Sequence, residues 1–457
     1  MKTWTRLFPP FVALVLVMML VACAPTQKFK YEFVPEVAAL LKREAPAYPP
    51  TKFIVISDLH LYDPSLGTEG KAFEEYLAQD RKLLRESVDI MGATVDAIRN
   101  EQASFVLLPG DLTKDGELVS HELAARYLGE IEAAGKKVYV VPGNHDINNG
   151  YAFKFVGDSI EHVPSATPTE FAQIYSQFGF EEALHRDSGS LSYVAEPVPG
   201  LRLLALDSCR YAENMEGEEP ITDGKFNAET LEWIEDMLGR ARIEDKAVIV
   251  MLHHGIVEHY TGQEKNYGEY IVDDFPAISK LLAMYNVRLV FTGHYHAQDM
   301  TLARYPKAHK FVYDIETGSL VTYPSPYRVG SIDADQKASI GSEYIKSIKS
   351  HPSDFPDYAR RYLRDGIEGI ATKAIMGYGV KQEEAESLAK QVAVAFVAHY
   401  AGDEDLPPGQ EVIQASGLSL RGWLVITFRK GLVHGLWNDL EPPDTNITIN
   451  LRTGEWQ

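Results

Sequence analysis

Polar side chains of the kinds that bind metal ions follow several short apolar runs of this chain. Asp58 and His60 follow the first run, and Asp111 follows the second. Further side chains of these kinds follow three later runs. The full set of candidates is Asp58, His60, Asp111, Asn144, His253, His294 and His296. Carboxylate, imidazole and amide groups suit first-row divalent metal ions. These seven donors are too many for one tetrahedral ion, so they predict a site for two ions that share a ligand.

The apolar runs have the length and composition of buried β-strands. They comprise residues 52–57, 104–109, 137–142, 201–207, 247–252, 288–293 and 311–317. Helix-like segments lie between several of them, at residues 71–99, 118–134, 227–240 and 274–286. This alternation predicts a layered α/β fold in which two sheets pack face to face with helices outside. Ligands bind at the carboxyl ends of strands in such folds, which is where the candidate residues lie.

Each motif taken alone has an ordinary structural explanation. Gly110-Asp111 is a common turn pair, and the adjacent His253 and His254 could be a buried pair without a ligand role. An aspartate two residues before a histidine is expected by chance in a chain with 14 histidines. The joint pattern, always at strand ends, is what indicates a dinuclear metal site.

The blocks D-x-H, G-D, G-N-H-D, H-H and G-H-x-H occur in this order across residues 52–320 and resemble the calcineurin-like metallophosphoesterase superfamily. The resemblance implies a four-layer α-β-β-α sandwich. It also implies two ligand sets that share Asp111. The first set is Asp58, His60, Asp111 and His296, and the second is Asp111, Asn144, His253 and His294. His253 is preferred over His254, and the two ions could be Mn, Fe, Zn or Co.

A looser similarity, in the loops GNHDINN and ETGSLVTYPSPYR, is to bacterial lipoprotein members that resemble cyclic nucleotide phosphodiesterases. It implies a small phosphodiester substrate, a 3′,5′-cyclic nucleotide. The predicted pair of metal ions would supply the nucleophile as a metal-bound hydroxide. Two alternatives stay open: a phosphomonoesterase such as a nucleotidase, and a metal- or ligand-binding lipoprotein without turnover.

His145 and Asp146 are the predicted catalytic pair. Hydrolysis of a phosphate ester needs a proton for the leaving oxygen, and His145 would donate it as general acid. Asp146 would accept a hydrogen bond from the other ring nitrogen, or would instead cap a turn. Tyr62, Tyr323 and Arg328 are weaker candidates for a substrate pocket, because ordinary loop positions explain them better.

The formal net charge of −21 argues against a nucleic-acid-binding surface, which would need a basic face. It does not exclude a phosphate-bearing substrate, because bound metal ions dominate the local field and salt screens charges beyond roughly 10 Å.

Residues 1–23 are predicted to be a lipoprotein signal peptide. Two basic residues precede an apolar run, and Leu20-Val21-Ala22-Cys23 resembles a bacterial lipobox. A lipid on Cys23 would anchor the protein on the extracytoplasmic face of a bacterial cell membrane. The alternative is a plain signal peptide with a chance cysteine. Cys209 would then be the only other thiol, so no intrachain disulfide is expected.

The rest of the chain divides into three predicted parts. Residues 24–50 are proline-rich and form a tether, with one short helix near residues 37–43. Residues 51–330 form the metallophosphoesterase domain. Residues 331–457 form a smaller, mainly helical C-terminal domain, with a short hairpin near residues 446–456.

Overall fold

The protein is described here by a computed structural model that covers residues 35–402, 404–406 and 408–457. The predicted signal peptide and Cys23 lie outside the described residues, as does the first part of the tether. These described residues belong to one compact unit. In the described ranges, every helix is too short or too polar to cross a membrane.

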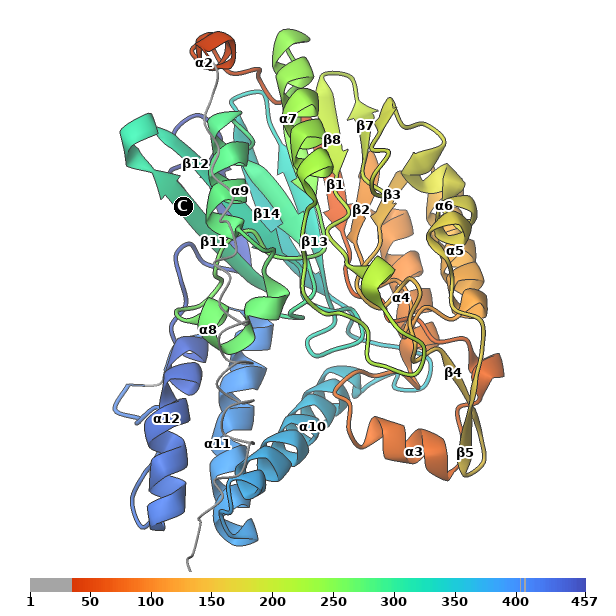
Figure 1. Cartoon of the computed structure of the whole chain (residues 1–457), viewed down its shortest axis with the longest axis vertical. Coiled ribbons are helices and arrows are strands. Elements are labelled where there is room, and N and C mark those ends of the chain that lie inside the picture. Colours follow the sequence, from red (N-terminus) through yellow and green to blue (C-terminus); the bar gives the residue numbers. More distant parts are fainter. Residues whose placement is uncertain (1–34, 403, 407) are drawn as a thin grey trace, which may run out of the picture. The chain divides into compact units, whose positions relative to one another are not determined.

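Two mixed sheets and one small hairpin contain the strands (Figure 1). The six-stranded sheet has the order β15-β14-β13-β1-β2-β3, and the seven-stranded sheet has the order β11-β12-β10-β9-β8-β7-β6. The strands of the first sheet are β1 (Thr51–Val55), β2 (Phe105–Pro109), β3 (Lys137–Val141), β13 (Pro326–Ile332), β14 (Lys337–Tyr344) and β15 (Asn446–Asn450). Those of the second are β6 (His185–Arg186), β7 (Tyr193–Val198), β8 (Leu201–Ala205), β9 (Ala247–Met251), β10 (Leu289–Thr292), β11 (Asp299–Tyr305) and β12 (Lys310–Glu316). The hairpin pairs β4 (Phe153–Val156) with β5 (Ser159–His162).

Helices lie on the outer faces of both sheets. The described α-helices are α2 (Pro35–Leu41), α3 (Lys71–Leu77), α4 (Ser87–Asn100), α5 (Leu118–Ala133), α6 (Pro168–Ile174), α7 (Ala228–Ile243), α8 (Gln263–Tyr267), α9 (Phe275–Met284), α10 (Phe355–Gly377), α11 (Gln382–Ala401) and α12 (Leu420–Leu436). α5 packs on β3 with α4 beside it, whereas α7 packs on β9 and α9 on β12. These contacts produce the predicted α-β-β-α layers.

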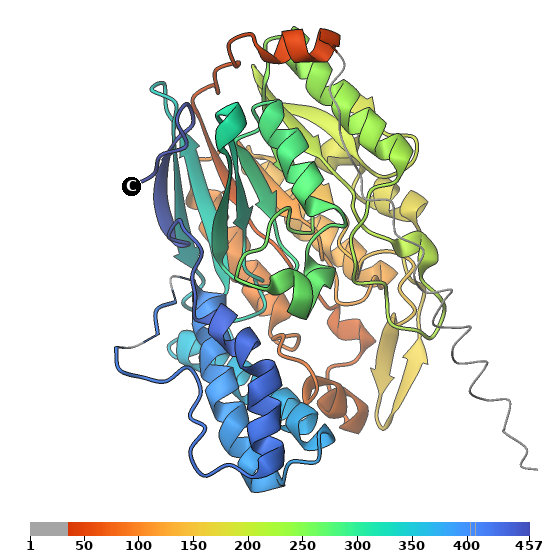
Figure 2. The same cartoon turned by 60° about the vertical axis from the view of Figure 1, so that its left-hand side comes forward.

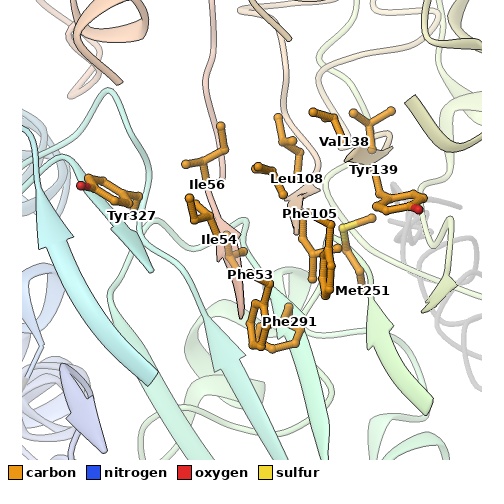
Figure 3. Close-up of a cluster of buried hydrophobic side chains, with 14 of the residues drawn as sticks. Phe53, Ile54, Ile56, Phe105, Leu108, Val138, Tyr139, Met251, Phe291 and Tyr327 are labelled. Atoms are coloured by element: carbon orange, nitrogen blue, oxygen red, sulfur yellow. The ribbon is translucent and has the colours of Figure 1, made fainter. Parts of the chain in front are cut away.

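Aromatic residues fill the space between the two sheets. The Phe53 ring stacks on Phe105 of the neighbouring strand at 5.5 Å and meets Phe291 of the opposite sheet edge-on at 5.2 Å. Figure 3 shows these rings with Met251 in the same layer. Burial of one such side chain stabilises the fold by about 1.5–3 kcal/mol, so this layer holds the two sheets in a fixed relation.

The parallel strands of both sheets place the motif loops at one edge. β1, β2 and β3 run parallel in the first sheet, and β8, β9, β10 and β12 run parallel in the second. The seven apolar runs predicted as strands are confirmed within about two residues, as β1, β2, β3, β8, β9, β10 and β12. The sequence pattern therefore located the strands that carry the candidate ligands.

The structure differs from the expected organisation in two places. Residues 71–99 form two helices, α3 and α4, which the non-helical residues 78–86 separate. The boundary expected at residue 330 falls inside β13, and two strands after it, β14 and β15, complete the first sheet. The alternating burial along β14 is the signature of a strand with one covered face.

Helices α10, α11 and α12 lie side by side beyond the sheets (Figure 2). α10 begins beside Pro356, which occupies the first turn, where a missing backbone N–H removes no helical hydrogen bond. A hydrogen bond of 2.9 Å from Arg81 Nε to the Tyr400 hydroxyl links α11 to the segment between α3 and α4. The helical character expected for this region is confirmed, and α12 is an additional helix.

Candidate metal centre

The candidate ligands all lie on loops that follow parallel strands. Two follow β1, one follows β2, one follows β3, one follows β9 and two follow β10. Their side chains are buried, with residue exposures between 0 and 6%. The two sheets therefore contribute ligands to the same buried region.

Two groups of potential ligand atoms form there, and Asp111 belongs to both. Asp58, His60, Asp111 and His296 form one group, and Asp111, His253 and His294 form the other, with ligand atoms within 4.8 Å of one another in each group. Asp111 Oδ2 lies 3.5 Å from His60 Nε2 and 3.5 Å from His253 Nε2. Asn144 Oδ1 lies 3.1 Å from His253 Nε2, on the side of the second group. The arrangement is that of a carboxylate between two sites.

The chemistry of the first group fits a cation. His60 Nε2 and His296 Nε2 are only 3.0 Å apart. The Asp111 carboxylate lies 3.5 Å from His60 Nε2, and the Asp58 carboxylate lies 3.5 Å from His296 Nε2. Burial holds the pKa of His60 well below its ordinary value and also lowers that of His296, so both rings are neutral. Two neutral imidazole nitrogens at this distance either share a hydrogen bond, if one ring carries its proton on Nε2, or both offer lone pairs to one cation. The buried clusters are thus consistent with a dinuclear metal site.

The electrostatics of Asp111 agree with this role. Burial alone would raise the pKa of its carboxyl, but the neighbouring His253, His145 and His60 hold it well below the usual range. The carboxylate is therefore ionised at neutral pH and available to two cations.

Five of the candidate ligands have left-handed backbone conformations. Their φ angles are 51° for Asp58, 36° for His60, 51° for Asp111, 80° for His294 and 72° for His296. Residues other than glycine seldom adopt positive φ, and such strain concentrates at functional sites. The conformation has a local use, since the His294 amide donates to Asp58 Oδ2 at 3.1 Å. Strain of this kind cannot be inferred from aspartate and histidine in a sequence.

Two glycines of the motifs lie where neighbouring loops leave no room for a Cβ atom. A Cβ atom at Gly143 would overlap the Asp111 carboxylate, and one at Gly293 would overlap Ser57 and the Asp58 carboxylate. Glycine at these positions lets the loops after β3 and β10 press against the carboxylates that the loops after β1 and β2 provide.

His145 lies at the exposed edge of the clusters, and its partner differs from the predicted one. Its side chain is 23% exposed, and Nδ1 lies 2.7 Å from Asp115 Oδ1. Asp146 instead accepts hydrogen bonds from the backbone amides of Gly143, Leu112 and Thr113, at 2.8, 3.1 and 2.9 Å. The prediction that Asp146 orients His145 is corrected, because this carboxylate ties the loop after β3 to the loop after β2.

The surroundings of His145 favour its protonated form. Burial alone would lower the pKa of the imidazole, but Asp111 and the hydrogen bond with Asp115 raise it above its ordinary value. Asp115 is itself held in an ion pair with Lys114. A protonated ring at the edge of the clusters can donate a proton to a bound molecule.

The contacts of His254 answer the question that the H-H motif left open. Its Nδ1 lies 2.7 Å from the Ser208 hydroxyl, and its Nε2 lies 2.8 Å from the Thr222 carbonyl oxygen. Both ring nitrogens are thus engaged outside the clusters, whereas His253 Nε2 faces Asp111. The geometry favours His253 as the ligand and gives His254 a supporting position against His294, at 4.5 Å between ring centroids.

Three functional candidates were missed by sequence reasoning: Asp115, Arg81 and Lys82. Lys82 is 8% exposed and pairs with Asp80 at 3.6 Å, and its charge lowers the pKa of both His60 and His145. The charge of Arg81 likewise lowers the pKa of His296. Arg81 and Lys82 could have been found from the charged triplet Asp80-Arg81-Lys82, which interrupts the apolar periodicity of residues 71–99.

The weaker pocket candidates have structural roles. Arg328 is fully buried and donates to the backbone carbonyl oxygens of Glu316, Asp299 and Asp444. The Tyr62 hydroxyl donates to the Leu66 carbonyl oxygen at 2.9 Å, and Tyr323 packs against the core.

A cavity of about 330 Å³ lies among the C-terminal helices, and Tyr270 in its wall also contacts the His294 ring. Aliphatic side chains of α10, α11 and α12 form most of its wall, and Arg81, Tyr267, Tyr270 and Tyr295 form one end. The Tyr270 ring lies 4.5 Å from the His294 ring, centroid to centroid. The organic part of a molecule bound at the clusters would therefore meet aromatic and aliphatic side chains.

Comparison with known proteins agrees with the residue patterns. The family model described as calcineurin-like phosphoesterase matches residues 51–298. No curated protein matches the chain.

Solved structures are similar to this chain at low identity. A dimetal phosphatase from Danio rerio is 15% identical, with 66% of this chain and 97% of that chain covered and a TM-score of 0.46. Purple acid phosphatase PPD1 from yellow lupin seeds is 13% identical, with 66% and 52% covered and a TM-score of 0.41. A 5′-nucleotidase precursor from Thermus thermophilus is 12% identical, with 72% and 60% covered and a TM-score of 0.37.

Proposed function

Because the chain belongs to the calcineurin-like phosphoesterase family, a family of metal-dependent hydrolases, we propose that it cleaves phosphodiesters at the two His/Asp clusters. The observation that carries the proposal is the position of Asp111. Its Oδ2 is equally close, at 3.5 Å, to a histidine of each cluster, as a ligand shared by two ions requires.

Each cluster supplies a complete set of donors in the proposal. Asp58, His60, Asp111 and His296 would hold the first ion, and Asp111, Asn144, His253 and His294 would hold the second. His294 Nε2 faces the Thr222 carbonyl oxygen at 3.2 Å, so Nδ1 is the atom that it offers. Bound divalent ions of the Mn, Fe, Zn or Co type would activate water and neutralise phosphate charge.

The remaining steps belong to side chains of this chain. His145 donates its proton to the leaving oxygen, and Asp115 fixes the ring through Nδ1 so that Nε2 is the donating atom. Asn144 contributes oxygen without adding negative charge, which keeps the site attractive to an anionic substrate. A non-catalytic binding protein would have no use for an oriented acid at this position.

We propose a 3′,5′-cyclic nucleotide as the substrate. A cyclic diester carries one negative charge, and a planar base could stack on the Tyr270 ring beside His294. Arg81, at the same end of the cavity, can face the base or a ribose oxygen. Loop similarity to lipoprotein phosphodiesterases supports the same choice.

Lys82 favours a second candidate, a phosphomonoesterase such as a nucleotidase. The Lys82 ammonium group is buried, pairs with Asp80 at 3.6 Å, and lowers the pKa of His60 and His145 through its charge. A monoester dianion carries nearly two negative charges and would gain more from such a cation than a diester would.

A substrate series distinguishes the two candidates. We expect kcat/KM for a 3′,5′-cyclic nucleotide to exceed that for the corresponding nucleoside monophosphate. Tyr270→Leu should raise KM for the cyclic nucleotide by about tenfold, since a stacked base is worth roughly 1–3 kcal/mol. Tyr270→Phe keeps the ring and is the matched control. A clear preference for the monophosphate would reject the diesterase assignment and support the nucleotidase.

We also propose attachment to the extracytoplasmic face of a bacterial cell membrane through a lipid on Cys23. The support is the lipobox-like sequence at residues 20–23, outside the described residues. Cys23→Ser should leave an unprocessed precursor that does not incorporate a fatty-acid analogue during metabolic labelling. Equal labelling of the variant and the wild type would contradict the proposal.

A further inference from the structure

Helix α12 is apolar on two opposite faces, but only one of them is covered. Ile426, Val433 and Leu436 are buried against the other C-terminal helices. On the other face, four large apolar side chains are exposed: Leu420 by 74%, Trp423 by 51%, Leu424 by 38% and Phe428 by 78%. We call these four residues the α12 face. A contiguous apolar face on a helix is normally covered, so a covering partner is expected for the α12 face.

The positions of these four residues form one continuous stripe. With 3.6 residues per turn, they fall within an arc of about 140° around the helix axis. By the same geometry, Arg421 and Lys430 flank this arc on its two sides. Basic residues beside an apolar arc can lay their aliphatic stems along an apolar phase and keep their charges at its surface.

The charge of α12 is opposite to that of the chain as a whole. Residues 420–436 contain Arg421, Arg429 and Lys430 and no aspartate or glutamate, whereas the whole chain has a net charge of −21. A local positive charge next to exposed apolar side chains is complementary to an anionic surface with an apolar interior.

A neighbouring tyrosine extends the stripe. Tyr378, which follows α10, is 53% exposed, and its hydroxyl accepts a hydrogen bond of 2.8 Å from Arg429. These two residues, together with Arg421, Leu424, Val425 and Phe428, line a groove of about 440 Å³. Tryptophan and tyrosine with arginine nearby are characteristic of the interface between lipid headgroups and acyl chains.

We propose that the α12 face docks on the surface of a bilayer that contains anionic lipids. The contact would hold the C-terminal helices at the membrane independently of catalysis and of any lipid at Cys23. A second copy of this chain is the other occupant of suitable shape. It is disfavoured because a symmetric contact would bring like-charged arginine and lysine side chains together without carboxylates from either copy of α12.

The test uses the full chain in vesicles that contain lipids brominated on the acyl chains, which quench tryptophan within the bilayer. We expect quenching with anionic vesicles, and Trp423→Phe should remove more than half of it. Trp437→Phe, at the C-terminal end of the same helix, is the matched control and should change it little. The double variant Arg421→Gln/Lys430→Gln should weaken the quenching and its dependence on salt.

Two results would overturn the proposal. One is equal quenching of the wild type and Trp423→Phe, which would show that the face does not reach the acyl chains. The other is a dimer in sedimentation without vesicles that Phe428→Ser dissociates, which would assign the face to a second copy. Trp423→Phe should keep its metal ions and its hydrolytic rate on a soluble ester, so failure of docking is separable from failure of the proposed function.

Discussion

Asp111→Ala is expected to lose both metal ions and almost all hydrolytic activity together. The reason is geometric: one carboxylate oxygen lies 3.5 Å from His60 of the first cluster and 3.5 Å from His253 of the second. Without it, the two ions would lose a common ligand and the charge that offsets their mutual repulsion. We expect activity to fall by about three orders of magnitude or more. Elemental analysis of the purified variant, with wild type prepared in parallel, measures the loss.

A ligand that belongs to only one cluster is the matched control. His253→Ala should retain about one equivalent of metal, because Asp58, His60, Asp111 and His296 remain together. Thermal unfolding with and without a chelator shows whether either variant has lost its fold instead of its ions. Two equivalents retained by Asp111→Ala would rule out the shared role of this carboxylate.

The strands and ligand loops could be predicted because their signals are local. A buried strand appears as a short apolar run, and the polar residues after Val55, Pro109 and Val141 stand next to it in the sequence. Parallel pairing then brings these loop starts to one edge without further information.

The partners of the ligands could not be predicted, because they depend on long-range folding. Asp115 meets His145 across 30 positions of sequence, and the nearer carboxylate, Asp146, turns away because three backbone amides bind it. Lys82, whose charge lowers the pKa of His60 and His145, lies in the non-helical segment between α3 and α4. Adjacency in sequence is therefore a poor guide to which carboxylate orients the acid.

The C-terminal region shows a second limit of sequence patterns. α12 was not predicted as a helix, because apolar residues on both of its faces remove the 3.6-residue alternation that marks an amphipathic helix. β14 was missed because residues 337–344 alternate small and polar residues with few large apolar ones. Tertiary packing, not local pattern, determines both elements.

His145→Ala is expected to keep its metal ions and still lose activity on esters with poor leaving groups. The imidazole lies at the edge of the clusters, 23% exposed, with its pKa raised above the ordinary value after Asp111 and Asp115 overcome the effect of burial. Removing a general acid costs on the order of 10²–10⁴-fold when the leaving oxygen needs a proton. Activated aryl esters leave without protonation and should lose much less. Rates on an alkyl and a nitrophenyl diester, with metal content measured on the same samples, test the expectation.

Two aspartate variants separate the acid from its support. Asp115→Asn removes the charge beside Nδ1, so it should lower the rate mainly on poor leaving groups, in the same direction as His145→Ala but by less. Asp146→Asn weakens the link between the loops after β2 and β3, so it should lower thermal stability without a special dependence on the leaving group. An equal loss on both ester types in His145→Ala would argue against a general acid and would point to a role in binding substrate. The same leaving-group dependence in Asp146→Asn would restore that carboxylate as the orienting residue.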